Sequence, residues 1–243
     1  FSSGQEVEKV QPPLARVEHA VACGERGLAK LLIEIIRGKV LYDAVGKNSF
    51  YWSGHYWKAG RVNEAYDTSL EALSDTLAAA RDELLKKAVD PQDEKAAAGF
   101  NKRGERIQKK GLDKINSLRG GDAVFKLACR GADSLGVDGD MLDDRPWLFP
   151  CVNGTIELRT GLFRPGRQDD FLTRVCSTPW QGLDCPAPYW EKFLSQISNN
   201  RPEWVSYVQK TIGVALIGVS LERIFSIWTG GGTNGKSVFV EVL

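Results

Sequence analysis

The residues with the clearest chemistry lie near the end of the sequence, in the stretch GGGTNGKS at positions 230–237. Gly230 is followed, after four residues, by Gly235, Lys236 and Ser237, which is the spacing of a phosphate-binding (Walker A) loop. In such a loop, glycines let backbone amides point at phosphate oxygens, and the following helix adds the positive end of its dipole. We therefore expect Lys236 to neutralise the β- and γ-phosphates of ATP, and Ser237 to bind Mg²⁺ through its hydroxyl.

The flanks of this loop fit the two elements that must hold it, a buried strand before it and a helix after it. Ile224, Phe225, Ile227 and Trp228 precede the loop, and Val238, Phe239, Val240, Val242 and Leu243 follow it. We predict a buried strand and then the buried start of a helix. The alternative, a glycine-rich hairpin, gives no reason for a lysine and a serine at these positions.

Hydrolysis of ATP needs groups that the loop does not provide. An acidic residue must help to hold Mg²⁺, a polar group must orient the attacking water, and an arginine commonly comes from a neighbouring subunit. We assign no catalytic residue, and we expect these 243 residues alone neither to hydrolyse ATP nor to hold a nucleotide. Because the sequence begins with Phe1 rather than Met, we also expect an internal fragment of a longer protein.

A second candidate site is the basic stretch, FNKRGERIQKKGLDKINSLRG, at residues 100–120. A basic helix can contact nucleic-acid phosphates without reading the base sequence. The alternative is the solvated face of an antiparallel helical hairpin, and both interpretations stay open. The candidate nucleic-acid contacts are Lys102, Arg103, Arg106, Lys109 and Lys110.

Other residues that could do chemistry have simpler interpretations. Trp52, Tyr56 and Trp57 could stack on bases, but strands of a small sheet use aromatic residues in the same way. The aspartates between residues 138 and 144 lack the spacing of a calcium loop. The five cysteines form no Cys-x-x-Cys pair, and the two histidines have no second ligand at metal-binding spacing. We predict free thiols and no metal site apart from the nucleotide-bound Mg²⁺.

The elements that carry these residues are mostly helical. Apolar residues recur at helical spacing over 14–37, with a break near Gly24 and Gly27, and again from 68 to about 131, with a break at Asp90-Pro91. Two hairpins are predicted, one turning at Ser53-Gly54 and one around Thr160-Gly161, and two helices follow residue 188.

We predict an α+β fold, mostly helical with small β-hairpins, ending in the stub of an α/β phosphate-loop ATPase. The expected domains are a loose arm at 1–13, a module of helices and hairpins at 14–222, and the first strand and loop of the ATPase at 223–243. A net charge of +1 gives no global attraction to nucleic acid. No apolar run is long enough to cross a membrane.

Three segments of the sequence resemble the phage and plasmid primase-helicases, which are related to the poxvirus primase-helicase and carry a superfamily 3 helicase. They are SFYWSGHYWKAGR, VNGTIELRTGLFRPGRQDDFLTRV and the closing stretch with GTNGKS. The resemblance implies a module between an upstream primase of the same chain and a downstream hexameric DNA helicase that uses ATP and Mg²⁺. It implies DNA and further copies of the chain as partners, in the cytoplasm, with a bacterial host. Only Gly230, Gly235, Lys236 and Ser237 carry over from the family's motifs.

Two alternatives remain beside this hypothesis. One is a stand-alone DNA-binding or oligomerisation module that uses the basic stretch. The other is the N-terminal part of an unrelated phosphate-loop kinase.

Overall fold

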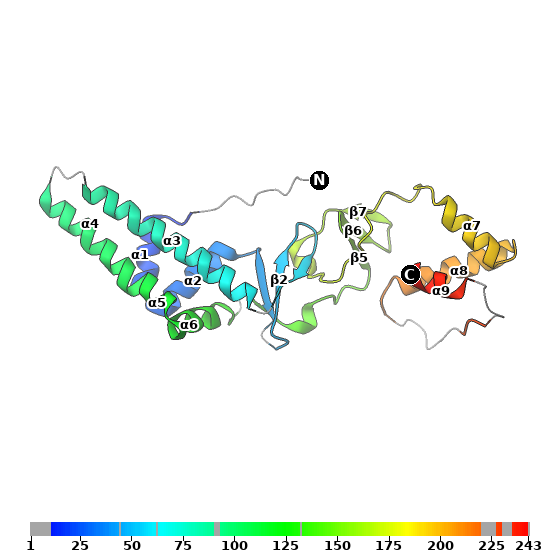
Figure 1. Cartoon of the computed structure of the whole chain (residues 1–243), viewed down its shortest axis with the longest axis horizontal. Coiled ribbons are helices and arrows are strands. Elements are labelled where there is room, and N and C mark those ends of the chain that lie inside the picture. Colours follow the sequence, from blue (N-terminus) through cyan, green and yellow to red (C-terminus); the bar gives the residue numbers. More distant parts are fainter. Residues whose placement is uncertain are drawn as a thin grey trace. The chain divides into compact units, whose positions relative to one another are not determined.

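The computed structural model describes residues 11–43, 45–61, 63–89, 93–131, 133–219, 227–229 and 235–242. They form an α+β structure in which helices predominate and the sheets are small (Figure 1), as predicted. The chain divides into two compact units: Phe1–Asp144 with Arg167–Arg174, and Arg145–Gly166 with Val175–Leu243. The predicted domain boundaries stay a prediction. The arm at 1–10 and the residues at 224–226 lie outside the described residues.

The first unit begins with two helices, α1 (Leu14–Ala22) and α2 (Gly24–Ile36), separated at the predicted break. Gly24 has a φ of 65°, in the left-handed region that favours glycine. Gly27 is not part of the break, because it lies inside α2. A Cβ atom at Gly27 would come within 2.1 Å of the carbonyl oxygen of Ala20, so the missing side chain lets α2 pack closely on α1.

Two longer helices, α3 (Glu64–Val89) and α4 (Glu94–Ile107), form an antiparallel hairpin (Figure 1). The Asp93 side chain caps α4 by accepting a hydrogen bond of 2.8 Å from the amide of Lys95. The predicted break at Asp90-Pro91 lies outside the described residues. After α4 the chain continues through a π-helical turn (Gln108–Leu112), α5 (Asp113–Asn116) and α6 (Leu118–Ala128).

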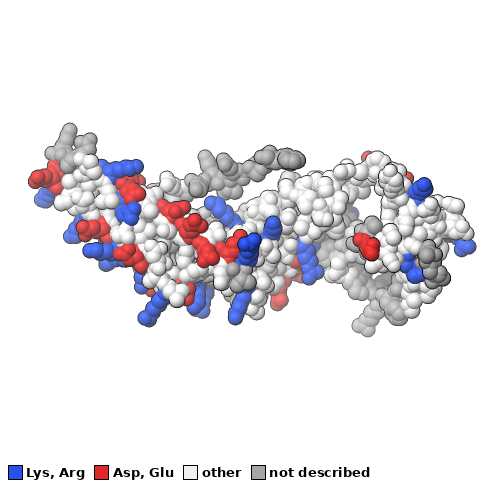
Figure 2. All heavy atoms as spheres, viewed as in Figure 1, with Lys and Arg blue, Asp and Glu red and all other residues white. Residues whose placement is uncertain are grey.

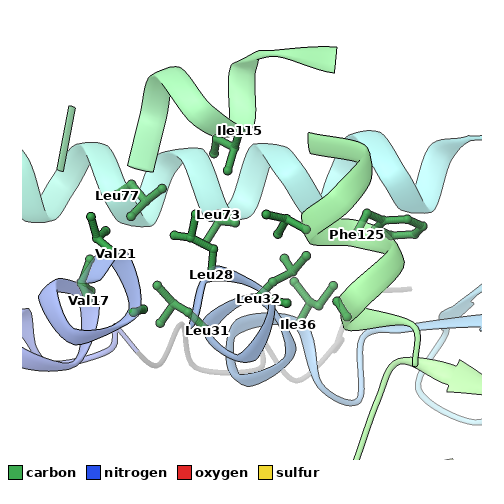
Figure 3. Close-up of a cluster of buried hydrophobic side chains, with 14 of the residues drawn as sticks. Val17, Val21, Leu28, Leu31, Leu32, Ile36, Leu73, Leu77, Ile115 and Phe125 are labelled. Atoms are coloured by element: carbon green, nitrogen blue, oxygen red, sulfur yellow. The ribbon is translucent and has the colours of Figure 1, made fainter. Parts of the chain in front are cut away.

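The core of this unit lies between α1, α2, α3 and the segment from the π-helical turn to α6 (Figure 3). The predicted apolar stripe of α3 is confirmed at Leu73, Leu77 and Leu84, which are fully buried, and is wrong at Leu85, which is 39% exposed. Each fully buried leucine stabilises the fold by roughly 1.5–3 kcal/mol relative to an exposed one. Within the described residues, no helix is both long and apolar enough to cross a lipid bilayer.

A four-stranded sheet joins these helices, in the order β3 (Trp57–Ala59), β2 (Asn48–Trp52), β1 (Val40–Asp43), β4 (Gly136–Val137). β1, β2 and β3 pair antiparallel, and β4 pairs parallel to β1. The hairpin at Ser53-Gly54 is confirmed, with a φ of 100° at Gly54. Trp57 is 1% exposed, and its indole N–H donates to the carbonyl of Gln168 at 2.9 Å. Its role is therefore packing rather than base stacking.

Residues Arg167–Arg174, which we call the strap, belong to the first unit. The residues that separate them from the rest of that unit, Arg145–Gly166, belong to the second unit. The strap contains a 3-10 turn (Gln168–Asp170). The amide of Trp57 donates to the carbonyl of Leu172 at 2.7 Å, and Asp143 accepts from the amide of Thr173 at 2.7 Å. The aspartates near residue 140, in and after the 3-10 turn Gly139–Met141, thus lie in a structured loop. Among the described residues, no group of histidines, cysteines and acidic residues is arranged to hold a metal ion.

The second unit contains a three-stranded antiparallel sheet of β5 (Leu148–Cys151), β6 (Gly154–Glu157) and β7 (Leu162–Arg164). The turn at Thr160-Gly161 is confirmed, with a φ of 70° at Gly161. Helices α7 (Pro188–Ile197) and α8 (Pro202–Ala215) both begin with a proline, which suits the first helical turn. The last helix, α9 (Lys236–Val242), carries the end of the candidate loop. All five cysteines are free, as predicted.

Candidate functional site

The described part of the candidate phosphate loop is its end, where Gly235 leads into α9. Gly235 has a φ of 77°, and its carbonyl accepts a hydrogen bond of 2.9 Å from the amide of Phe239. The helix begins at Lys236, where the motif places it. Gly230 and residues 231–234 lie outside the described residues, so the phosphate-binding role of all four motif residues stays a prediction.

Close packing against α7 fixes the backbone at Gly235. A Cβ atom there would lie 2.9 Å from side-chain atoms of both Ile197 and Phe193. A larger residue would therefore have to displace the side chains of Ile197 and Phe193, in addition to adopting an unfavourable left-handed conformation. Gly235 is thus required by local packing as well as by the motif.

A stack of aromatic rings holds α9 in place. Phe239 is 5% exposed, and its ring lies 4.7 Å from Trp228 and 5.9 Å from Trp190, with ring planes within 27° of parallel in both pairs. The prediction of a buried helix start is confirmed at Phe239. It is wrong at Val238 and Val240, which are 50% and 72% exposed, because only one side of the short helix meets α7 and α8.

The prediction of a buried strand before the loop is wrong at residues 227–229, the part of this segment that the structure describes. Residues 227–229 have no regular secondary structure, and Ile227 is 72% exposed. Trp228 makes the contacts in this segment, stacking on Phe239 and meeting the Trp204 ring edge-on at 5.9 Å. The reason is that a central strand is buried by neighbouring strands, and among the described residues no strand pairs with this segment.

A cavity of about 350 Å³ adjoins the start of α9. Apolar side chains provide most of its wall. Its lining comprises Thr211, Ile212, Ala215, Trp228, Lys236, Phe239 and Val240. The packing of α8 and α9 therefore places Lys236 beside this cavity. The sequence motif predicts that Lys236 contacts phosphate and does not predict the cavity.

The basic stretch lies on α4 and the π-helical turn, and its five candidate cations are exposed. Arg103 donates to both carboxylate oxygens of Glu18 on α1 at 2.6 Å, and this hydrogen bonding lowers the pKa of Glu18. Lys109 lies 4.0 Å from Glu105. Figure 2 shows blue and red side chains intermingled over the helices of this unit, on the face that is visible. This mixture supports the interpretation as a solvated helical face, and DNA contact stays a prediction.

A further cavity, which the sequence patterns did not reveal, lies in the first unit between the sheet, α3 and α6. Its volume is about 610 Å³. Tyr42 on β1, Tyr66 on α3 and Phe125 on α6 meet there edge to face, and Lys47, Lys126 and Arg130 also contribute to its lining. No local spacing could have identified it, because these residues are far apart in the sequence and are brought together only by packing.

Comparison with known proteins adds independent findings. "Putative helicase 184R" of Invertebrate iridescent virus 6 is 31% identical over 116 residues, which are 46% of this chain and 12% of that protein. "Putative helicase 121R" of Invertebrate iridescent virus 3 is 22% identical over 237 residues, which are 87% of this chain and 25% of that protein. The chain thus spans a quarter or less of the length of these two relatives.

A protein-family model described as "D5 N terminal like" matches residues 29–199. The match includes α3 to α6, both small sheets and α7. It ends before α8 and α9, so the candidate phosphate loop lies beyond it. Because it takes in most of the sequence and agrees with the primase-helicase resemblance of the hairpin segments, the chain belongs to the D5 N-terminal-like family of primase-helicases.

Proposed function

We propose that this chain is the module of a replicative primase-helicase that joins an upstream primase to an ATP-driven hexameric DNA helicase. The observation that carries the proposal is the order of the parts: a D5 N-terminal-like region at residues 29–199 is followed by a Gly-Lys-Ser sequence at the start of α9. The helicase names of the viral relatives support the same assignment over the kinase alternative. DNA, further copies of the chain and the primase are the proposed partners. The cytoplasmic, bacterial-host setting expected from the resemblance is part of the proposal.

ATP and Mg²⁺ are the proposed cofactors at the loop. Gly230 and Gly235 would let backbone amides face the phosphates, Lys236 would neutralise the β- and γ-phosphates, and Ser237 would bind Mg²⁺. The chemistry supplied by the bound nucleotide is phosphoryl transfer to water. Since that step needs an acidic residue and an arginine beyond the loop, we propose that it belongs to the full-length protein and not to these 243 residues alone.

The test is ATP hydrolysis by the full-length protein, with and without the Lys236→Ala substitution. We expect the variant to lose about 100-fold or more in kcat, because a charge that stabilises the transition state is removed. Lys192→Ala, at an exposed lysine on α7, is the control and should retain activity. Equal hydrolysis by the protein with and without Lys236 would contradict the proposal. So would hydrolysis by the 243-residue chain that Lys236→Ala abolishes.

A second candidate function, DNA binding or self-association by the isolated chain, is favoured by the exposed cations of the basic stretch. Among the described residues, Lys102, Arg106 and Lys110 have no ion-pair partner. They therefore provide a cleaner test than Arg103 or Lys109. The matched control neutralises three exposed lysines elsewhere in the first unit, Lys30, Lys58 and Lys86.

Binding of single- and double-stranded DNA should be measured over a salt series. Neutralising Lys102, Arg106 and Lys110 to glutamine should reduce the slope of log affinity against log salt by about 2, since each phosphate contact contributes about 0.7–0.9. The control triple should leave the slope unchanged. An equal salt slope in the two triple variants would exclude this surface as the DNA contact. Sedimentation of the same samples tests self-association.

A further inference from the structure

The proposed function assigns no role to the cavity between the four-stranded sheet, α3 and α6, which we call the α3–α6 cavity. Its volume of about 610 Å³ lies within the range of about 300–1,000 Å³ that is usual for small-ligand sites. Both apolar and polar side chains line it, and they come from β1, the β1–β2 turn, β2, the start of α3, α6 and the residues next to these helices. All of these elements belong to the first unit, so the cavity is formed within one compact body.

One side of the cavity is aromatic. The ring of Phe125 lies 5.4 Å from Tyr42 and 5.3 Å from Tyr66, with interplanar angles of 72° and 76°. Phe125 is buried, whereas Tyr42 and Tyr66 are half-buried and therefore keep part of their surface accessible. Partly accessible aromatic rings suit a planar, aromatic ligand, because stacking on a ring needs no particular hydrogen-bond pattern.

The aromatic side is accompanied by cations. Lys47 lies in the β1–β2 turn, and Lys126 and Arg130 lie at and after the end of α6; all three are exposed. Lys126 is loosely paired with Asp122 at 4.0 Å, which leaves it able to approach a ligand anion. Three cations beside a hollow are suited to a phosphate group.

Polar groups in the same lining suit the edge of a base or a sugar. Asp67, Asp122 and Asn63 also line the cavity. Burial, together with a hydrogen bond to Asp122, raises the pKa of Tyr66. The carboxylates accept hydrogen bonds from N–H and O–H groups, which the base and the sugar of a nucleoside offer.

Two lining residues hold an uncommon backbone conformation. Lys47 has a φ of 55° and Asn63 a φ of 67°, in the left-handed region that asparagine tolerates and lysine seldom adopts. Such residues are concentrated at ligand-binding positions, where the surrounding structure holds them against the strain. Both shape the cavity from loops that flank its helical and sheet walls.

We propose that this cavity binds one nucleotide, with the base against Tyr42 and Tyr66 and the phosphate between Lys47, Lys126 and Arg130. The nucleotide is either free or an unpaired residue of a single strand, and the shared chemistry is an aromatic base joined to a phosphate. The single-strand case rests on the proposed helicase function, whereas the binding of a nucleotide as such does not.

The direct test is photochemical crosslinking of the 243-residue chain, carrying Lys236→Ala so that the candidate phosphate loop does not contribute. One probe is 5-iodo-2′-deoxyuridine monophosphate, and the other is a short oligo-dT strand that contains a single 5-iodo-deoxyuridine. We expect crosslinks in the peptides that contain Tyr42 or Tyr66, identified by mass spectrometry. Crosslinking by the monophosphate identifies a free-nucleotide site, and crosslinking by the strand alone identifies a strand site.

The cations are tested by the triple variant Lys47→Asn, Lys126→Gln, Arg130→Gln, in which asparagine tolerates the left-handed conformation at position 47. The matched control is Lys30→Gln, Lys58→Gln, Lys86→Gln, which removes the same charge from exposed positions outside the cavity lining. Crosslinking at Tyr42 or Tyr66 should disappear in the first variant and persist in the second. For the strand probe, the salt slope should fall by about 2 in the first variant only.

Three results would overturn this inference: no crosslink with either probe, crosslinks only in peptides that lack Tyr42 and Tyr66, or an equal loss of crosslinking in both triple variants. Circular dichroism and the thermal midpoint of each variant show whether it is folded, and single substitutions replace a triple variant that is not. Failure here is distinguishable from failure of the proposed function. ATP hydrolysis that depends on Lys236 would stand even if this cavity bound nothing.

Discussion

Burial gives the cysteines very different chemistry, although the sequence presents all five as equivalent. Burial raises the pKa of Cys129 to about 12, whereas Cys23 and Cys185 are exposed. Burial and the neighbouring Cys176 raise the pKa of Cys151 as well. Since the thiolate is the reactive form, these differences become differences in alkylation rate.

We predict that iodoacetamide at pH 8 modifies the exposed Cys23 and Cys185 rapidly in the folded protein, and Cys129 much more slowly because its raised pKa leaves little thiolate. Peptide mass spectrometry after timed quenching measures the rates, and the same reaction in denaturant should modify all five. Modification of Cys129 as fast as that of Cys23 in the folded state would contradict the raised pKa of its half-buried thiol.

The same thiol makes stability depend on pH. The unfolded thiol titrates near its usual value of 9.0 and the folded one near 12, so the unfolded state alone loses its proton between them. The contribution of Cys129 to the free energy of unfolding is therefore complete below about pH 9 and falls as pH rises towards 12. Denaturant titrations over this pH range should show that the free energy of unfolding falls more steeply with pH in the unaltered protein than in Cys129→Ala. An equal pH dependence in the two proteins would contradict this prediction.

At the scale of elements, the two predicted hairpins and the predicted helices after residue 188 are confirmed, because turn residues and initial prolines act locally. Gly27 shows why the rest could not be predicted: a glycine that breaks a helix and one that lets two helices approach look alike in sequence. The strap and the α3–α6 cavity depend on contacts between residues that are far apart in the sequence, and the periodicity of apolar residues does not predict such contacts.

Two helical glycines make this distinction measurable. Gly27→Ala places a methyl group 2.1 Å from the Ala20 carbonyl, so α1 and α2 must separate, and we expect a loss of about 1–3 kcal/mol. Gly99→Ala on α4 meets nothing within 4 Å, and helix propensity predicts a gain of up to about 1 kcal/mol. Urea denaturation of both variants measures the difference, and a stabilising Gly27→Ala would refute the close packing described.

At the scale of the whole chain, the two compact units alternate along the sequence, since the strap returns to the first unit after the β5–β7 sheet. The residues that join this sheet to α7 are a candidate weak point. Leu183 in this connection is 80% exposed and lies outside any helix or strand.

We predict that limited digestion with chymotrypsin cuts first in this connection, after Leu183 or Trp180, because an exposed segment without regular structure fits a protease most easily. The N-terminal product should keep the four-stranded sheet and the α1–α6 core, and its far-ultraviolet circular dichroism should remain helical. The double substitution Trp180→Gly, Leu183→Gly should remove this cut and leave later cuts unchanged. A first cut inside α3 or α4 would indicate that the helical core is the less stable part.

The strap has a mechanical consequence. Any tension applied to the chain after residue 175 acts first on Arg167–Arg174. This strap is bound to the rest of the first unit by hydrogen bonds that Trp57 donates to Gln168 and Leu172, and by one that Thr173 donates to Asp143. A pull on the chain after residue 175 would therefore have to break these bonds before it could separate Arg167–Arg174 from β3 and from the loop at Asp143.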